Sequence, residues 1–147
     1  MIKFLRDPQE ESVGVPVIGK NSEAFSVGDA VYIDSDGFLA KATTSSKILG
    51  YSIQDVTMAS DNQTVAKVKP LYIYAEGVEV EIDSDQACTQ TDIGAYADLG
   101  TVTSGAQVLN LAAGATGQFF VLGFDVDDTD KVVVTVAEPQ KFGYAQS

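Results

Sequence analysis

Apolar and polar residues alternate along much of this chain with a period of two, which is the spacing of β-strands that have one buried and one exposed face. The clearest run is residues 65–83, where apolar residues at 78, 80 and 82 alternate with the acidic residues Glu79, Glu81 and Asp83. A second strong signal is the β-branched run at 131–136. Helical periodicity is missing from every window of about 11 residues or more. The pattern therefore predicts an all-β fold with, at most, a short helical turn near 56–60 or 86–92.

A glycine-punctuated segment appears twice in diverged form, at about 24–55 and about 93–125. Each copy begins with a glycine and a short strand, passes through a glycine turn into a second strand, and ends in an apolar strand. That last strand has a central glycine in both copies, Gly50 and Gly123. The repetition predicts two hairpin-rich modules within one domain.

The start of the chain differs from the rest. Ile2, Phe4 and Leu5 are apolar, but the polar run at 7–11 interrupts the pattern before any regular strand begins. We therefore expect residues 1–12 to form an extended N-terminal arm and residues 13–147 to form a single β domain. The apolar tip of this arm would dock onto a partner or onto the core of the chain itself, and a frayed terminus is the alternative.

Composition excludes several classes of partner. The 147 residues include 21 acidic and nine basic residues, giving a formal net charge of −12. Such a charge opposes binding to nucleic acids, which requires clustered Lys and Arg, and adsorption to anionic membranes. No apolar run reaches the roughly 18 residues of a membrane helix, and the N-terminus becomes polar too soon for a signal peptide. We expect a soluble protein that is made in the cytoplasm.

Two acidic turns resemble cation-binding loops. The segment Asp34-Ser35-Asp36-Gly37 has the alternating carboxylates of a calcium loop, but Ser45 stands where such a loop needs a bidentate glutamate. We expect a plain turn there, closed by Asx side chains and a glycine. The loop at 125–130 has four aspartates, which are either solvated or bridged by a structural Ca²⁺. We expect no resident metal or cofactor.

A third acidic group has the spacing of a strand face. Glu79, Glu81, Asp83 and Asp85 occupy every second position, so a regular strand would present all four on one face. That face is either open to solvent or matched to a Lys- and Arg-bearing surface on another subunit.

Catalytic residues are not evident in the sequence. The chain has no histidine, so neither a Ser-His pair nor an activated cysteine is available. A zinc ligand set and a phosphate-binding glycine loop are also missing. The single cysteine, Cys88, cannot form an internal disulfide, and we expect an inert or half-buried thiol. We predict that the protein is not an enzyme.

The first module also carries a family resemblance. Residues 28–43, Gly-Asp-Ala-Val-Tyr-Ile-Asp-Ser-Asp-Gly-Phe-Leu-Ala-Lys-Ala-Thr, followed by Ile48-Leu49-Gly50, resemble the head decoration (cement) proteins of tailed bacteriophages. This resemblance implies a β-barrel or β-tulip-like body that forms a homotrimer.

The same resemblance implies a place and a partner. Such trimers bind the major capsid protein on the outer surface of the virion and stabilise the shell. An N-terminal arm with Ile2, Phe4, Leu5 and Arg6 would then contact the capsid. The alternatives are another virion component, such as a head fibre or tail protein, or a carbohydrate- or calcium-binding β module.

Overall fold

The computed structural model describes residues 2–6, 15–52, 55–60, 70–71, 78–100, 106–112 and 117–137. These residues are almost entirely strands and turns, with one short 3-10 helix, η2 (Gln90–Asp92). The predicted all-β class is confirmed, and η2 lies in one of the two places where a helical turn was expected.

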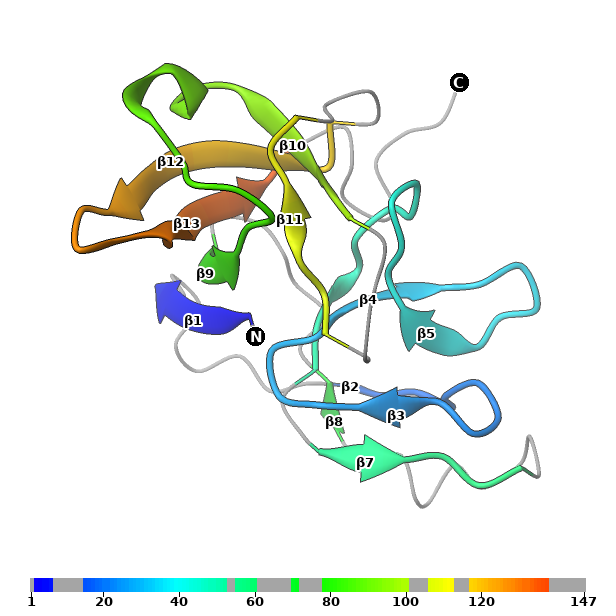
Figure 1. The fold of residues 1–147 in the computed structure, drawn as a ribbon. Helices are drawn as coiled ribbons and strands as arrows, with labels where there is room; N and C mark the ends of the chain where they lie inside the picture. Colours follow the sequence, from blue (N-terminus) through cyan, green and yellow to red (C-terminus); the bar gives the residue numbers. More distant parts are fainter. Residues whose placement is uncertain are drawn as a thin grey trace.

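The described strands form one six-stranded sheet and three smaller sheets, and neighbouring strands are antiparallel throughout. In the large sheet the order is β1 (Lys3–Arg6), β9 (Glu79–Asp83), β13 (Asp128–Val136), β12 (Phe119–Asp125), β10 (Tyr96–Leu99) and β11 (Leu109–Asn110). The smaller sheets pair β2 (Val15–Pro16) with β8 (Pro70–Leu71), pair β3 (Ala24–Phe25) with β7 (Val56–Thr57), and place β4 (Ala30–Ile33) between β5 (Leu39–Lys41) and β6 (Gly50–Tyr51). Strands β9 to β13 occupy one half of the molecule and β2 to β8 the other (Figure 1).

The two halves share a pattern of strand pairing among their described residues and are here called repeat 1 (residues 15–71) and repeat 2 (residues 79–136). In each, the central strand (β4 or β10) lies between the strand that follows it and a later strand. Even the hydrogen bonds at the start of the central strand correspond. They are Gly28 N to Ser52 O (2.7 Å) and Ser52 N to Asp29 O (2.8 Å) in repeat 1, and Gly94 N to Val121 O (2.9 Å) and Val121 N to Ala95 O (3.0 Å) in repeat 2.

The correspondence continues through the hairpin. Leu39 and Leu109 are fully buried at equivalent places, and each forms a parallel bridge to the strand that opens its own repeat, at Gly19 and Ser84 respectively. Each bridge therefore joins the segment after the first strand of its repeat to the second strand of the hairpin. A single bridge does not close a barrel, and the predicted closed barrel is not found among the described residues.

The register corrects one detail of the predicted repeat. Gly50 lies opposite Val31 in repeat 1, whereas Phe119 lies opposite the equivalent Ala97 in repeat 2. Gly50 therefore corresponds to Phe119 and not to Gly123, which lies four positions further along the strand.

The turn predicted at residues 34–37 is confirmed. The Asp34 carboxylate accepts hydrogen bonds from the backbone amides of Asp36 and Phe38, both at 2.9 Å. Gly37 has a φ of +89°, which an L side chain rarely adopts. The loop is thus closed from within by its own aspartate.

Buried apolar residues form one large cluster and one small one. The small cluster contains Phe25, Val31, Leu39 and Met58 and belongs to repeat 1. The large cluster combines the inward side of repeat 2, including Val80 and Phe119, with Ala30 and Tyr51 of repeat 1. One side of repeat 1 is therefore packed against the core of repeat 2.

Two buried glutamines join the repeats through hydrogen bonds to the backbone. The Gln107 side chain accepts from Ala30 N (2.7 Å) and donates to Ala30 O (2.9 Å) and Ala42 O (3.0 Å). Gln118 accepts from Leu99 N (2.8 Å) and donates to the carbonyls of Thr43 (2.6 Å) and Ser46 (2.8 Å). Buried polar groups stabilise a fold only when they are paired, and both amides have several partners.

The N-terminus is part of the fold, which corrects the prediction of an arm at residues 1–12. Strand β1 pairs with β9, and Ile2 is 3% exposed in the large cluster. The Ile2 carbonyl oxygen lies so close to Gly28 that a Cβ there would be 2.1 Å away. Of the two docking partners considered for residues 2–6, the structure shows the chain's own core; residues 7–12 lie outside the described part.

Candidate binding surface

The outward face of the six-stranded sheet has an aromatic part on β10 and β12. Along β12, Phe119 and Val121 point into the core, so Phe120 and Leu122 point outward. Phe120 pairs across the sheet with Tyr96, and their rings meet edge to face with centroids 5.6 Å apart and planes at 70°. Tyr96 is 53% exposed and Leu122 40% exposed. We call Tyr96, Phe120 and Leu122 the aromatic patch.

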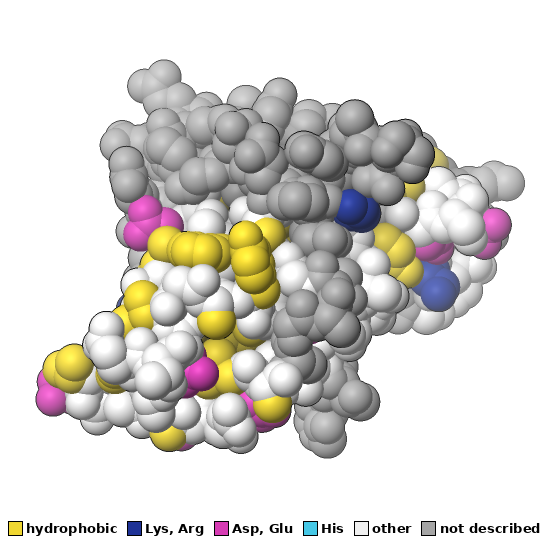
Figure 2. All heavy atoms as spheres, turned by 90° about the horizontal axis from the view of Figure 1, so that it is seen from above, with side chains coloured by type: hydrophobic (Ala, Val, Ile, Leu, Met, Phe, Trp, Pro, Cys, Tyr) yellow, Lys and Arg dark blue, Asp and Glu magenta, His cyan; other side chains and the backbone are white. Residues whose placement is uncertain are grey.

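The same face has an acidic part on β9. Val78, Val80 and Ile82 are buried, and Glu79, Glu81 and Asp83 alternate with them on the outward side, as the sequence predicted. We call these three carboxylates the acidic strip. Seen from above, a group of hydrophobic side chains lies at the surface, with a few separate acidic side chains around it (Figure 2).

Bases in the neighbouring strands face the acidic strip. Lys3 of β1 lies opposite Glu81, and Lys131 of β13 lies opposite Asp83. Lys131 donates to the Asp83 carboxylate in an ion pair that lowers the pKa of Asp83 and raises the pKa of Lys131. Lys131 therefore balances part of the negative charge at this end of the strip. The Asp83 carboxylate stays ionised at a lower pH than an ordinary aspartate would.

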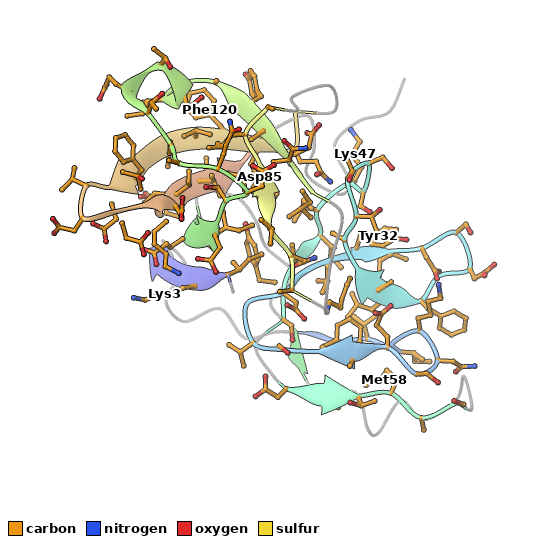
Figure 3. All side chains as sticks on the ribbon, in the orientation of Figure 1. Lys3, Tyr32, Lys47, Met58, Asp85 and Phe120 are labelled. Carbon is orange, nitrogen blue, oxygen red and sulfur yellow. The ribbon has the colours of Figure 1, made fainter. Side chains whose placement is uncertain are left out.

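The fourth predicted member, Asp85, is not part of this strip. It follows the end of β9, and its backbone amide donates to Leu109 O at 2.9 Å. Its carboxylate accepts a hydrogen bond from the amide of Leu111 at 3.3 Å. Figure 3 labels Asp85, Phe120 and Lys3; Lys3 lies on the edge strand β1, whereas Phe120 lies on the interior strand β12.

The residues predicted to touch a partner at the N-terminus lie in or next to β1. Ile2 is buried in the core. Phe4, Leu5 and Arg6 belong to β1, and the directions of their side chains lie outside what the structure describes. Contact of these three residues with a partner stays a prediction.

The acidic loop between β12 and β13 is a tight turn. The Asp125 carboxylate accepts from Asp127 N (2.9 Å), and the Asp128 carboxylate accepts from Asp130 N (3.3 Å). Val126 at the tip is 80% exposed. Across the described ranges, no group of three or more acidic or cysteine side chains is placed to hold a metal ion.

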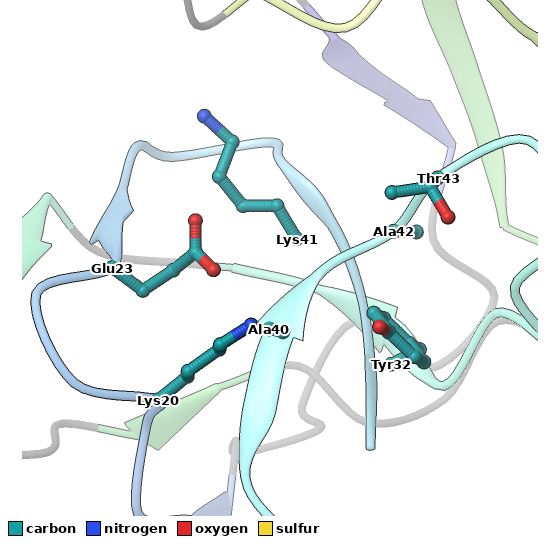
Figure 4. Close-up of a pocket in the computed structure, with 7 residues that line it drawn as sticks. All are labelled: Lys20, Glu23, Tyr32, Ala40, Lys41, Ala42 and Thr43. Carbon is teal, nitrogen blue, oxygen red and sulfur yellow. The ribbon is translucent and has the colours of Figure 1, made fainter. Parts of the chain in front are cut away.

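A shallow hollow of about 320 Å³ lies on repeat 1. Glu23 lies between Lys20 and Lys41 in the view of Figure 4, and Tyr32 forms part of the wall. The Lys41 ammonium lies 3.5 Å from the Asp29 carboxylate, which also accepts from the Ser26 amide. Charges of both signs line this hollow, and they can take part in contacts with a charged partner.

Cys88 is buried, as expected. Burial, together with the nearby Asp92 carboxylate, raises the pKa of its thiol. The thiol is thus protonated at neutral pH and a poor nucleophile.

Comparisons of the chain with known protein families, curated proteins and solved structures found no match. In the part of the chain that the structure describes, no helix has the length and apolar character needed to cross a membrane.

Proposed function

We propose that this protein is a decoration (cement) protein of a tailed bacteriophage head, which binds the major capsid protein on the outside of the shell as a homotrimer and stabilises it without catalysis. The glycine-spaced motif of repeat 1 resembles that family, and the duplicated, internally hydrogen-bonded scaffold suits a mechanical role. The protein would be made in the host cytoplasm and end on the virion surface.

The observation that carries this proposal is the two-part outward face of the large sheet. Large exposed apolar side chains in a cluster mark interaction surfaces, and Tyr96 and Leu122 are exposed on either side of the half-buried Phe120. The acidic strip on the same face favours a partner surface that carries Lys and Arg. A capsid presents its surface in many copies, so a multimer can bind firmly through contacts that are individually weak.

The test uses empty capsids assembled from the phage's major capsid protein. We expect the wild-type chain to sediment with them at a fixed ratio and to raise their melting temperature. Glu81→Gln, in the acidic strip, should weaken this binding. Asp36→Asn removes one negative charge from an exposed turn of repeat 1 and is the matched control, which should bind capsids as the wild type does. A wild-type chain that stays in the supernatant and leaves capsid melting unchanged would contradict the proposal, as would equal binding by the two variants.

A further inference from the structure

Equivalent faces of the two repeats have very different surroundings. By register, Ala30 and Tyr51 on one side of repeat 1 correspond to Tyr96 and Phe120 of repeat 2. Ala30 and Tyr51 have no exposed surface because the core of repeat 2 covers them. The chain therefore covers this face in repeat 1 and leaves the equivalent face of repeat 2, the aromatic patch, open.

The uncovered face has the larger side chains. Where repeat 1 pairs Ala30 with Tyr51, repeat 2 pairs Tyr96 with Phe120, and Leu122 extends the same outward row. Tyr96 contributes little to the stability of a monomer, because about half of its surface remains in contact with water, while Phe120 beside it is half-buried. The composition of the patch instead resembles the centre of a protein interface, where Tyr and Phe are enriched.

The charges of the two repeats indicate which surface would cover the aromatic patch. Repeat 2 has ten acidic residues and one basic residue, whereas repeat 1 has six acidic and five basic residues. Two aromatic patches brought face to face would also bring two strongly acidic repeats together, and like charges repel. Repeat 1 of another chain offers a nearly neutral surface with Lys20 exposed and Lys41 and Lys47 half-buried.

We propose that the aromatic patch of repeat 2 is a self-association site that receives repeat 1 of a second copy of this chain. Within one chain, repeat 2 covers one side of repeat 1. The proposed contact would place repeat 1 of the next chain on the opposite side of repeat 2, so repeats 1 and 2 would alternate along the assembly. The contact is head-to-tail, so it uses two different surfaces and forms either a closed ring or an open chain. The inference rests on the proposed trimer, for which it names the contact; the acidic strip is left to face the capsid.

The test is the oligomeric state of the isolated protein, measured by native mass spectrometry and sedimentation velocity at micromolar concentration. We expect the wild type to be an oligomer and Tyr96→Lys to be a monomer with an unchanged circular dichroism spectrum. Val126→Lys places the same charge on the exposed tip of the β12–β13 turn and should remain oligomeric. A monomeric wild type, or a Tyr96→Lys oligomer of unchanged size, would overturn the inference.

A mixing experiment tests the head-to-tail geometry directly, provided that both variants keep the wild-type circular dichroism spectrum. Lys20→Glu removes a positive charge from the opposite surface and should also weaken assembly. A mixture of Tyr96→Lys and Lys20→Glu retains one intact pair of surfaces, so it should form dimers and nothing larger. Failure to form dimers, or assembly into full oligomers, would contradict a head-to-tail contact.

The two proposals can fail separately. A wild-type monomer that still binds capsids would refute the self-association site and the homotrimer, and leave capsid binding standing. An oligomer that depends on Tyr96 but ignores capsids would refute decoration and leave the self-association site standing.

Discussion

The buried glutamines that join the two repeats give the sharpest test of how this fold is held together. Gln118 has no exposed surface, and its side chain satisfies three backbone groups. The Thr43 carbonyl keeps a second donor, the Ser46 amide at 3.1 Å. Truncation by Gln118→Ala would therefore leave two buried groups, Leu99 N and Ser46 O, without these partners.

The expected loss follows from that count. An unsatisfied buried backbone group costs about 1–3 kcal/mol, so two of them cost about 2–6 kcal/mol. Gln107→Ala should cost about the same, because Ala30 O keeps the Ala42 amide as a donor while Ala30 N and Ala42 O lose their partners. Domains of this size are stable by about 5–15 kcal/mol in total, so either loss is large.

A second substitution separates hydrogen bonding from packing. Gln118→Leu fills most of the space with apolar atoms and leaves no room for a water molecule to replace the amide. If the hydrogen bonds dominate, the Leu variant is at least as unstable as the Ala variant. If the site needs only volume, the Leu variant is the more stable of the two.

The differences in the free energy of unfolding are measured by urea titration. Unfolding is monitored by circular dichroism and by tyrosine fluorescence, since the chain has no tryptophan. Gln90→Ala is the control, because Gln90 is exposed in η2 and its loss should change stability by no more than about 0.5 kcal/mol. A loss below about 1 kcal/mol for both buried glutamines, or a Gln118→Leu variant that is clearly more stable than Gln118→Ala, would refute the reasoning.

Three further predictions concern single sites. Gly28→Ala should destabilise the fold by more than the roughly 1–2 kcal/mol due to positive φ alone, because its Cβ would also meet a carbonyl oxygen. Gly37→Ala, with a similar φ and open space around it, should lose only that amount in the same urea titration. Lys131→Met should lower the melting temperature at neutral pH. Because Lys131 lowers the pKa of Asp83, the difference in melting temperature from wild type should persist above about pH 3.9 and disappear as the pH falls through that lowered pKa. A difference that does not depend on pH would count against the ion pair. Cys88 should react with Ellman's reagent far more slowly in the native protein than in urea, since burial raises its pKa, and equal rates would show that the thiol is accessible.

Local patterns were enough to predict much of the fold. The alternation at 78–83 correctly identified which side of β9 is buried, because burial on one face imposes a period of two. The aspartate-glycine turn at 34–37 was predictable because its hydrogen bonds form within five residues.

Contacts between distant segments were not predictable in this way. Strand β1 is short, and its partner β9 lies more than 70 positions away in the chain. Gln107 and Gln118 are ordinary polar residues next to apolar ones, and nothing nearby in sequence shows that they hold the backbone of repeat 1. The one local indication is that each glutamine is a polar residue next to a strand whose inward side chains are otherwise apolar.

The register of the repeats explains why matching glycines misled the comparison of the two copies. Repeat 1 pairs Val31 with Gly50, and repeat 2 pairs the smaller Ala97 with the much larger Phe119 at the same place. The larger residue lies on the central strand in repeat 1 and on its partner strand in repeat 2, so the same backbone pairing is compatible with different side chains. On the opposite face, repeat 1 has Ala30 where the core of repeat 2 covers it, and repeat 2 has Tyr96 where the face is open.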